Sequence, residues 1–491
     1  MYLLGIDIGT SSIKVSVVEA NTSKCIATTQ FPESETPITA LEKGWAEQSP
    51  EMWWDHIQQA ILKLHSTKKY TPSDISAIGI SYQMHGLVLV DKNKQVLRDS
   101  IIWCDSRAVN IGEKAFNAIG SEKCLSHLLN SPGNFTASKL AWVKQNEPDI
   151  YKNIAHVMLP GDFVSMKFTG NVTTSISSLS EGIFWDFKNN ELSKDVLNYY
   201  GIDASLLPKI QPVFSNHGEL LSDVAHHLNL KSGIPITYKA GDQPNNALSL
   251  NVLEPGEVAA TAGTSGVIYG VTDKVTYDQQ SRVNTFAHVN HTQDVNRLGV
   301  LLCINGTGIL NSWVKKMIGA GNDYPQMNQA AGQIHPGSDG LHIMPFGNGA
   351  ERIFNNKMIG AHFVNLDFNK HSQAHIYRAA QEGIAFTFRY GIDIMRENGM
   401  NPSIIRAGYS NMFLSEVFTE AFVNATHVPV ALYHTDGSVG AAIGAGIGSG
   451  IYKDATEAFG NFKPIKVVEP NNAKGFNDLY LSWHHSLSKL L

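Results

Sequence analysis

Short apolar segments with the character of β-strands alternate with helical segments along the whole chain. The clearest helix is predicted to begin after Ser49, a favourable N-cap, with Pro50 at its first position, where a missing N–H costs little. Apolar side chains then recur at helical spacing and give this helix one buried face: Trp53, Ile57, Ile61 and Leu64. The alternation of the two element types over 491 residues predicts an α/β fold.

One local pattern occurs twice, about half the chain length apart. A strand over 2–8 leads through the turn Gly9-Thr10-Ser11-Ser12 into a second strand over 13–18. A strand over 257–262 leads in the same way through Gly263-Thr264-Ser265-Gly266 into a strand over 267–271. Both segments are typical of β-hairpins. The repetition predicts two related α/β halves, each with one hairpin tip that is rich in glycine and hydroxyl groups.

Two such tips that face each other would suit the phosphates of a nucleoside triphosphate. Glycine lets backbone N–H groups approach phosphate oxygens closely, and Thr and Ser hydroxyls add further donors. The chain has no Walker loop, because the pattern G-x-x-x-x-G-K-[ST] does not occur in it. Either turn alone is better explained as ordinary hairpin chemistry, and only the pair favours a nucleotide site.

Two acids lie at the carboxyl ends of predicted strands. Asp7 ends an apolar strand directly before the first tip, where packing does not explain a carboxylate and where a hydrated Mg²⁺ would accept it, directly or through water. Asp242 follows a strand over 236–241, and ligands of α/β sheets bind at such strand ends. A helix N-cap or a first-turn charge explains Asp242 equally well at this stage.

Another strand, over 75–81, leads into Gln83-Met84-His85-Gly86, a segment whose amide, imidazole and glycine backbone could bind hydroxyl groups. A lone histidine is more often structural, and no second histidine at ligand spacing points to zinc. A strand over 101–102 ends at Trp103, whose indole either stacks on the C–H face of a sugar or belongs to the core.

Glycine is also frequent near the C-terminus. Gly408 and Asn411 lie where an apolar strand gives way to a helical stretch, and glycines between Gly440 and Gly450 punctuate a run of alanine and isoleucine. Small residues permit close backbone approach to a flat adenine or to another helix, and helix packing is the better explanation of the second stretch.

Charge and cysteine content exclude several classes of protein. Lys and Arg number 38 against 44 Asp and Glu, and this net charge of -6 gives no reason to expect nucleic acid or an anionic membrane as a partner. The four cysteines form no C-x-x-C pair, so neither a disulfide framework nor a metal finger is predicted. The N-terminus lacks the basic segment of a signal peptide, and no apolar run approaches about 18 residues. We therefore expect a cytoplasmic protein.

As a set, the motifs resemble those of the FGGY carbohydrate kinases, which are ATP-dependent sugar kinases of the actin/hexokinase superfamily. The segment 83–86 together with 103–107 is similar to the sugar site of their xylulokinase branch. The likeness runs through nearly the whole chain and includes 7–12 with Lys14, 44–50, 134–139, 241–243, 263–266, 349–352, 382–385 and 440–442.

The resemblance implies two actin-like (ribonuclease H-like) ATPase domains with a catalytic cleft between them. Motif placement puts these domains at 1–243 and 244–491, and we expect the helix-like closing segment 475–491 to return to the first domain. It implies ATP and Mg²⁺, and a ketose as substrate, D-xylulose in the first place, giving D-xylulose 5-phosphate. Asp242 would be the general base on the sugar hydroxyl, and Asp7 would assist Mg²⁺. Sugar contacts would come from Gln83, Met84, His85, Trp103, Asp242 and Gln243. Nucleotide contacts would come from Gly9, Thr10, Ser11, Ser12, Lys14, Gly263, Thr264, Ser265, Gly306, Gly408 and Asn411.

The chain departs from the family pattern at three places. Arg406 and Ala407 stand where the adenosine motif usually begins with glycines, which bears on nucleotide preference. Gln243, after Asp242, is more like glycerol kinase, and a serine-rich stretch over 174–180 replaces the usual acidic and alanine residues of its loop.

Other functions stay open as alternatives. Sedoheptulose, ribulose and other sugars or polyols are alternative acceptors, although Met84 and His85 argue against glycerol itself. A non-catalytic sugar sensor or an actin-like ATPase is disfavoured by the intact Asp7, Asp242 and both hairpins. A homodimer is left open, since relatives form dimers or tetramers.

Overall fold

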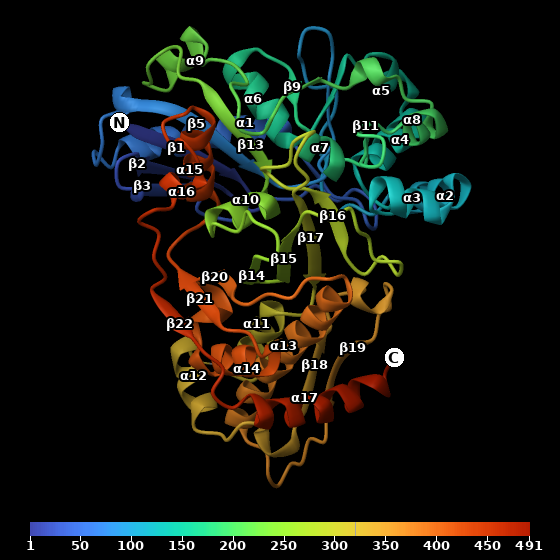
Figure 1. Ribbon diagram of the computed structural model, residues 1–491, viewed down its shortest axis with the longest axis vertical. Helices are drawn as coiled ribbons and strands as arrows, with labels where there is room; N and C mark the ends of the chain where they lie inside the picture. The colour runs from blue at the N-terminus through green and yellow to red at the C-terminus, as the bar shows by residue number, and fades with distance from the viewer. Residues whose placement is uncertain (320) are drawn as a thin grey trace.

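A computed structural model describes residues 1–319 and 321–491, and the chain forms two lobes, each built around one large sheet (Figure 1). The sheet of the first lobe has the strand order β13-β5-β1-β2-β3. β1, β2 and β3 are antiparallel neighbours, and β5 and β13 run parallel to β1. The strands are β1 (Tyr2–Ile8), β2 (Ile13–Glu19), β3 (Lys24–Phe31), β5 (Ile75–Tyr82) and β13 (Ile236–Gly241).

The sheet of the second lobe has the order β16-β17-β15-β14-β20-β21-β22, and its middle repeats the first sheet. The hairpin β14–β15 is antiparallel with β17 outside it, and β20 and β21 run parallel to β14 on its other side. The predicted pair of related α/β halves is therefore confirmed. The strands are β14 (Val258–Ala262), β15 (Gly266–Thr272), β16 (Asn284–Ala287), β17 (Leu298–Ile304), β20 (Ile405–Gly408), β21 (Val430–Tyr433) and β22 (Lys466–Val468).

Both predicted hairpins and the predicted helix are present. The β1–β2 hairpin closes with Ile8 opposite Ile13, and β14–β15 closes with Ala262 opposite Gly266. The helix α1 (Pro50–His65) begins at Ser49, whose hydroxyl accepts a hydrogen bond from the Met52 N–H at 3.4 Å. Its predicted apolar face is buried against β2 and β3, which shows how sequence periodicity sets its orientation.

The helix α15 (Gly437–Gly448) comes late in the chain but packs on the first sheet, against β1, β5 and β13. The approach is so close that a side chain on Gly5 or Gly79 would collide with the α15 backbone. The glycines of α15 also serve close packing, as expected, because side chains on Gly444 and Gly448 would collide with Tyr238 and Thr237. The partner, however, is the sheet strand β13 and not another helix. The last helix, α17 (Ala473–Ser488), packs on α13 (Gln373–Glu397), α14 (Glu416–Thr426) and β18 (His342–Phe346) of the second lobe. The expected return of the last helix to the first domain is therefore wrong: that crossing is made by α15.

Side chains from the first half of the chain cover the outer edge of β16, the edge strand of the second sheet. The Asn130 amide donates to the Thr285 carbonyl at 2.7 Å and accepts from the Thr285 N–H at 3.1 Å. Ser177 donates to the Ala287 carbonyl at 2.8 Å, and Ser180 accepts from the Ala287 N–H at 2.9 Å. These bonds satisfy backbone groups that an edge strand otherwise leaves unpaired. They also account for two of the serines in the stretch 174–180.

The other helices complete the two lobes, and no helix among the described residues is both long enough and apolar enough to span a membrane. They are α2 (Val109–Ile119), α3 (Ser121–Leu128), α4 (Thr136–Asn146), α5 (Pro148–Lys152), α6 (Pro160–Thr169), α7 (Ile176–Glu181), α8 (Lys194–Tyr200), α9 (Ser222–His227), α10 (Asp242–Ser249), α11 (Gly308–Met317), α12 (Tyr324–Gly332) and α16 (Ala455–Ala458). The short strands include β4 (Glu47–Gln48), β6 (Val88–Val90), β7 (Ser100–Ile101), β8 (His156–Met158), β10 (Trp185–Asp186), β11 (Glu191–Leu192) and β19 (Gly360–Val364).

Candidate active site

The first hairpin tip and the segment after β5 are joined by hydrogen bonds. The Thr10 hydroxyl donates to Gln83 Oε1 at 3.3 Å and accepts from the Trp103 indole nitrogen at 2.9 Å. Gln48 binds both partners, because its Nε2 donates to the Thr10 carbonyl at 2.8 Å while its Oε1 accepts from Gln83 at 3.1 Å. The structure therefore brings one predicted nucleotide residue, Thr10, against two predicted sugar residues. Trp103 stays 53% exposed.

His85 is held in one orientation and one tautomer. Its backbone is left-handed, with φ 62°, and its Nδ1 lies 2.9 Å from the Glu181 carbonyl. Because a carbonyl only accepts, Nδ1 carries the proton and Nε2 is the acceptor atom of the ring. Burial and the nearby Lys139 charge lower the pKa of His85 to about 3, so the ring is neutral. The rings of Phe135 and Phe286 contact it at centroid distances of 4.7 and 5.4 Å.

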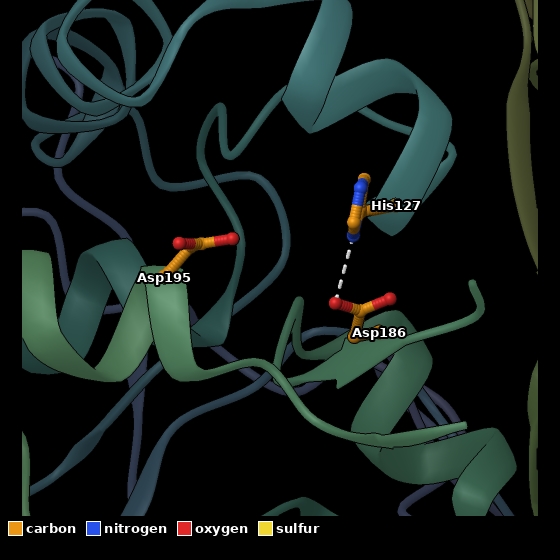
Figure 2. Close-up of side chains that lie close together, drawn as sticks. All are labelled: His127, Asp186 and Asp195. Atoms are coloured by element: carbon orange, nitrogen blue, oxygen red, sulfur yellow. Dashed lines mark hydrogen bonds and ion pairs between the residues drawn. The ribbon is translucent and has the colours of Figure 1, made fainter. Parts of the chain in front are cut away.

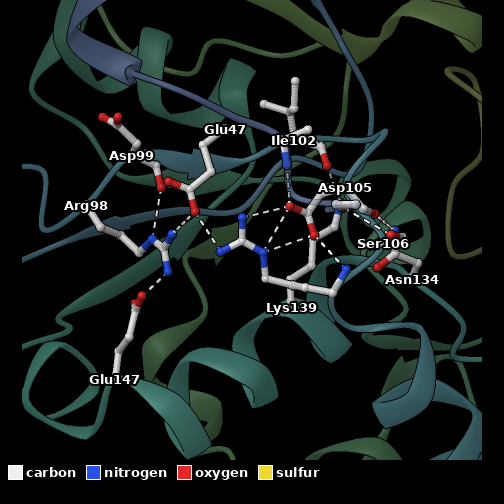
Figure 3. A network of polar contacts seen from close by, with 12 residues as sticks. Glu47, Arg98, Asp99, Ile102, Asp105, Ser106, Asn134, Lys139 and Glu147 are labelled. Carbon is white, nitrogen blue, oxygen red and sulfur yellow. Dashed lines mark hydrogen bonds and ion pairs between the residues drawn. The ribbon is translucent and has the colours of Figure 1, made fainter. Parts of the chain in front are cut away.

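The buried ammonium group of Lys139 holds the backbone next to His85 and Trp103. Lys139 Nζ donates to the carbonyls of His85 and Ile102, both at 2.9 Å, and burial lowers the pKa of Lys139 to about 7. Figure 3 shows that Lys139 adjoins a wider polar network around Asp105. There Asp105 accepts from the Ala46 N–H at 2.6 Å and from Arg107, whose guanidinium lies 3.8 Å from the centre of the Trp45 ring. These contacts connect the segment 44–50 to the segment 103–107, which contains Trp103.

Asp242 begins α10 at the carboxyl end of β13, as the strand pattern predicts. It is half-buried, and poor solvation raises its pKa to about 7, with a further contribution from the charge of Asp7. Gln243 stands beside it and opposes this shift through its hydrogen bonds to the carboxylate. A carboxylate with a pKa near neutrality suits a general base, because it accepts a proton at physiological pH and releases it again.

Asp7 lies at the end of β1, where the N-terminus of α15 meets the first hairpin. Asp436 caps α15 by accepting from the N–H groups of Ser438 and Val439, and its other oxygen forms an ion pair with Lys14 at 3.3 Å. A side chain on Gly437 would collide with the Asp7 carboxylate, so glycine is required at this approach. Burial raises the pKa of Asp7, and Asp436 adds to this effect. The two acids make a locally anionic position beside the hairpin tip.

A cavity of about 1290 Å³ opens in the second lobe at the tip of the β14–β15 hairpin. Gly263, Thr264 and Asn411 line it, together with residues of α11, α12 and α14. Ser265, Gly306 and Gly408 are not in its lining. The Gly306 N–H donates to Glu351 at 2.9 Å, and the neighbouring Gly308 lines the cavity instead. The cavity thus collects only part of the predicted nucleotide set.

Arg406 does not enter this cavity. Its guanidinium binds the Asn251 carbonyl and forms an ion pair with Glu257 at 2.7 Å, so it ties β20 to the start of β14. The departure from glycine at this position therefore places no charge against the cavity.

One group of side chains outside these sites has the spacing of metal ligands. Ligand atoms of His127, Asp186 and Asp195 lie within 4.8 Å of one another (Figure 2). Both acids already have partners, since Asp186 bonds His127 at 2.9 Å and Asp195 bonds Lys123 at 2.7 Å. The group is satisfied by internal pairing and needs no cation.

Three residues to which the sequence analysis gave no role contact His85, a predicted sugar residue. Glu181 and Lys139 are buried ionisable residues that bond His85, Glu181 through its backbone carbonyl and Lys139 through its Nζ, and Phe286 reaches the ring from the second lobe. Lys139 belongs to the family segment 134–139, but the sequence analysis assigned it no contact. Glu181 could have been noticed, because it is an acid that directly follows the serine-rich stretch 174–180. Phe286 could not, because an apolar residue in a strand is ordinary.

A repeated actin-like half, two hairpin tips and acids at strand ends define a two-domain phosphotransferase fold. Profiles of the FGGY family of carbohydrate kinases match residues 2–249 for the N-terminal domain and 258–449 for the C-terminal domain. The chain therefore belongs to the FGGY family of carbohydrate kinases and is a xylulokinase-like carbohydrate kinase that uses ATP. The predicted family, enzyme class and two-domain α/β fold are confirmed, whereas the boundary at 243/244 stays a prediction.

Named relatives cover most of the chain. The xylulose kinase of Bacillus subtilis is 30% identical over 403 residues, which are 81% of this chain and 78% of that protein. The structure of xylulose kinase from Rhodospirillum rubrum has a TM-score of 0.88 and 23% identity, over 100% of this chain and 99% of that one. The structure of glycerol kinase from Plasmodium falciparum with ADP has a TM-score of 0.89 and 20% identity, over 100% and 98%. The fold is thus shared by kinases named for different substrates.

Proposed function

We propose that this kinase transfers the γ-phosphoryl group of ATP to a ketose, D-xylulose in the first place, and that D-xylulose 5-phosphate is the product. The observation that carries the proposal is the position of Asp242. Asp242 begins α10 at the end of β13, and its pKa of about 7, raised by poor solvation and by the charge of Asp7, is that of a usable base. The names of relatives at up to 30% identity support D-xylulose as acceptor.

The residues on the sugar side would bind and orient the acceptor. His85 would offer its Nε2 lone pair to a sugar hydroxyl, and the half-exposed indole of Trp103 would stack on the C–H side of the sugar. Gln83 is buried and its amide bonds Thr10 and Gln48, so its contact with the sugar would exchange one of these bonds. Asp242 would orient the reacting hydroxyl and take its proton late, because the transition state of phosphoryl transfer is loose. General-base assistance of this kind contributes about 10²–10⁴-fold in rate.

The hairpin tips would hold the phosphates through backbone N–H groups and hydroxyls, with Gly9–Ser12 on one side and Gly263–Ser265 on the other. The anionic position formed by Asp7 and Asp436 fits a hard cation, since carboxylate oxygen is the ligand that Mg²⁺ prefers. Asp7 would hold Mg²⁺ directly or through water. The ion would supply charge neutralisation on the phosphates.

The acceptor is tested by measuring ADP release with and without a panel of sugars and polyols: D-xylulose, D-ribulose, sedoheptulose, gluconate and glycerol. We expect strict dependence on an acceptor and the highest kcat/KM with D-xylulose, with the product identified by its phosphorus resonance. A higher kcat/KM with another member of the panel would replace D-xylulose in the proposal. Turnover without any acceptor would instead support an ATPase of the actin type, and binding of a sugar without turnover would support a sensor.

A further inference from the structure

Glu181 is a buried acid at the end of α7, a helix that is held from two sides. Ser177 and Ser180 on α7 bind the edge of β16, as described above, and Ser178 lies 2.9 Å from the Tyr82 hydroxyl. Glu181 is only 2% exposed. The helix therefore fixes this carboxyl group between the second lobe and the end of β5.

The two oxygens of the Glu181 carboxyl group have different surroundings. Oε1 accepts a hydrogen bond of 2.6 Å from the Tyr82 hydroxyl. Among the described residues Oε2 has no hydrogen-bond partner, although it is fully buried. A buried polar atom without a partner is costly, by about 1–3 kcal/mol, so native proteins retain few of them without a reason.

Oε2 lies among the residues of the sugar side. It is 3.8 Å from His85 Nδ1, and a side chain on Gly241, next to Asp242, would lie 3.2 Å from it. The flexible thioether of Met84 lies against the same point of Gly241, so the contact proposed below requires Met84 to move aside. We propose that Glu181 is a specificity-determining residue of this kinase, whose Oε2 makes a hydrogen bond with one hydroxyl of the acceptor sugar. This inference rests on the proposed sugar site at Asp242.

The surroundings favour a neutral hydroxyl as the partner. Burial raises the pKa of Glu181 well above its ordinary range, and the charges of Asp242 and Asp162 add to this effect. In the protonated form that this direction favours, Oε1 accepts from Tyr82 and Oε2–H is available as a donor. A substrate anion would be repelled by Asp242 at this position, whereas a sugar hydroxyl oxygen accepts such a bond without a charge.

The test compares three variants of the full-length enzyme. Glu181→Met removes both polar atoms at similar size, Glu181→Gln keeps an acceptor for Tyr82 and a donor in place of Oε2–H, and Tyr82→Phe removes only the anchor of Oε1. Glu113→Met, on the exposed side of α2, is the matched control. Dissociation constants are measured by calorimetry, without nucleotide, for the best acceptor and for its monodeoxy analogues.

We expect Glu181→Met to weaken binding of the acceptor by about ten- to hundred-fold, the range of a hydrogen bond to a buried polar group. We expect Glu181→Gln to bind within about three-fold of wild type. The loss in Glu181→Met should vanish for the one deoxy analogue that lacks the contacted hydroxyl. An equal loss for every analogue, a loss matched by Tyr82→Phe, or a Glu181→Gln variant as weak as Glu181→Met would overturn the inference. Failure of the proposed function is distinct, because the wild type would then release no ADP in response to an acceptor, whatever the dissociation constants of the variants.

Discussion

The indole nitrogen of Trp103 donates a hydrogen bond of 2.9 Å to the hydroxyl of Thr10. Thr10 belongs to the first hairpin tip, and Trp103 follows the short strand β7, so the bond joins a predicted phosphate residue to a predicted sugar residue. Thr10 also donates to Gln83, which places a hydroxyl between the two halves of the expected reaction site. A sugar that engages Trp103 or Gln83 would therefore alter the hairpin that is expected to hold phosphate.

Sugar binding is expected to change the fluorescence of Trp103, because its half-exposed ring would lose solvent contact. Titration of the wild type with the preferred acceptor, without nucleotide, should shift or quench the tryptophan emission. Trp103→Phe should abolish most of this signal and weaken binding, as measured by calorimetry. A variant that retains the full fluorescence change would remove Trp103 from the sugar site.

Asp242→Asn should lower kcat by about 10²–10⁴-fold, because an amide cannot accept the proton of the sugar hydroxyl. The KM for ATP should stay within about three-fold of wild type, since the base does not bind the phosphates. Steady-state kinetics check both values, and Asp223→Asn on the exposed surface of α9 is the matched control. Near-normal turnover in Asp242→Asn would exclude the base role.

Activity should depend on pH through Asp242. Limited solvation and the neighbouring Asp7 raise the pKa of Asp242 to about 7, and the base is active only after it has lost its proton. The kcat/KM for the sugar should therefore rise about ten-fold per pH unit below 7 and level off above it. Asp7→Asn removes a negative neighbour and should move this limb to lower pH. A profile that is flat between pH 5.5 and 8 would contradict the assignment.

Asp7→Asn should also raise the Mg²⁺ concentration needed for half-maximal activity, by about 10–100-fold, the usual cost of losing a metal-supporting carboxylate. The KM for the sugar should change little. Initial rates at fixed ATP over a range of Mg²⁺ concentrations measure this shift. An unchanged requirement for Mg²⁺ would mean that Asp7 does not take part in holding the ion.

Asn130→Ala should destabilise the protein, because it leaves the N–H and carbonyl of Thr285 without partners inside the protein. Each buried group left unpaired costs about 1–3 kcal/mol, so the free energy of unfolding should fall by about 2 kcal/mol or more. Urea denaturation measures the change. Asn146→Ala, an exposed residue at the end of α4, should alter stability by less than about 0.5 kcal/mol and serves as the control.

Local sequence signals predicted the parts of the fold that local physics decides. The turn chemistry of Gly9–Ser12 and the apolar spacing after Ser49 are readable because hairpins and amphipathic helices leave a short-range period. The path of α15 was not readable, since a run of alanine and glycine permits close packing without saying on what. Glu181 and Phe286 were missed for the same reason: tertiary structure alone brings residues so far apart in the chain against His85.

The placement of α15 has a consequence for dividing this enzyme into parts. The helix lies far along the chain, at 437–448, yet it covers one face of the first sheet. It packs there so closely that a side chain on Gly5 or Gly79 would collide with its backbone. A fragment that stops near residue 243 would expose that apolar face to water, and a fragment that starts there would carry an orphaned apolar helix. The lobe that bears His85 and Asp7 is therefore completed only after residues 437–448 have been synthesised.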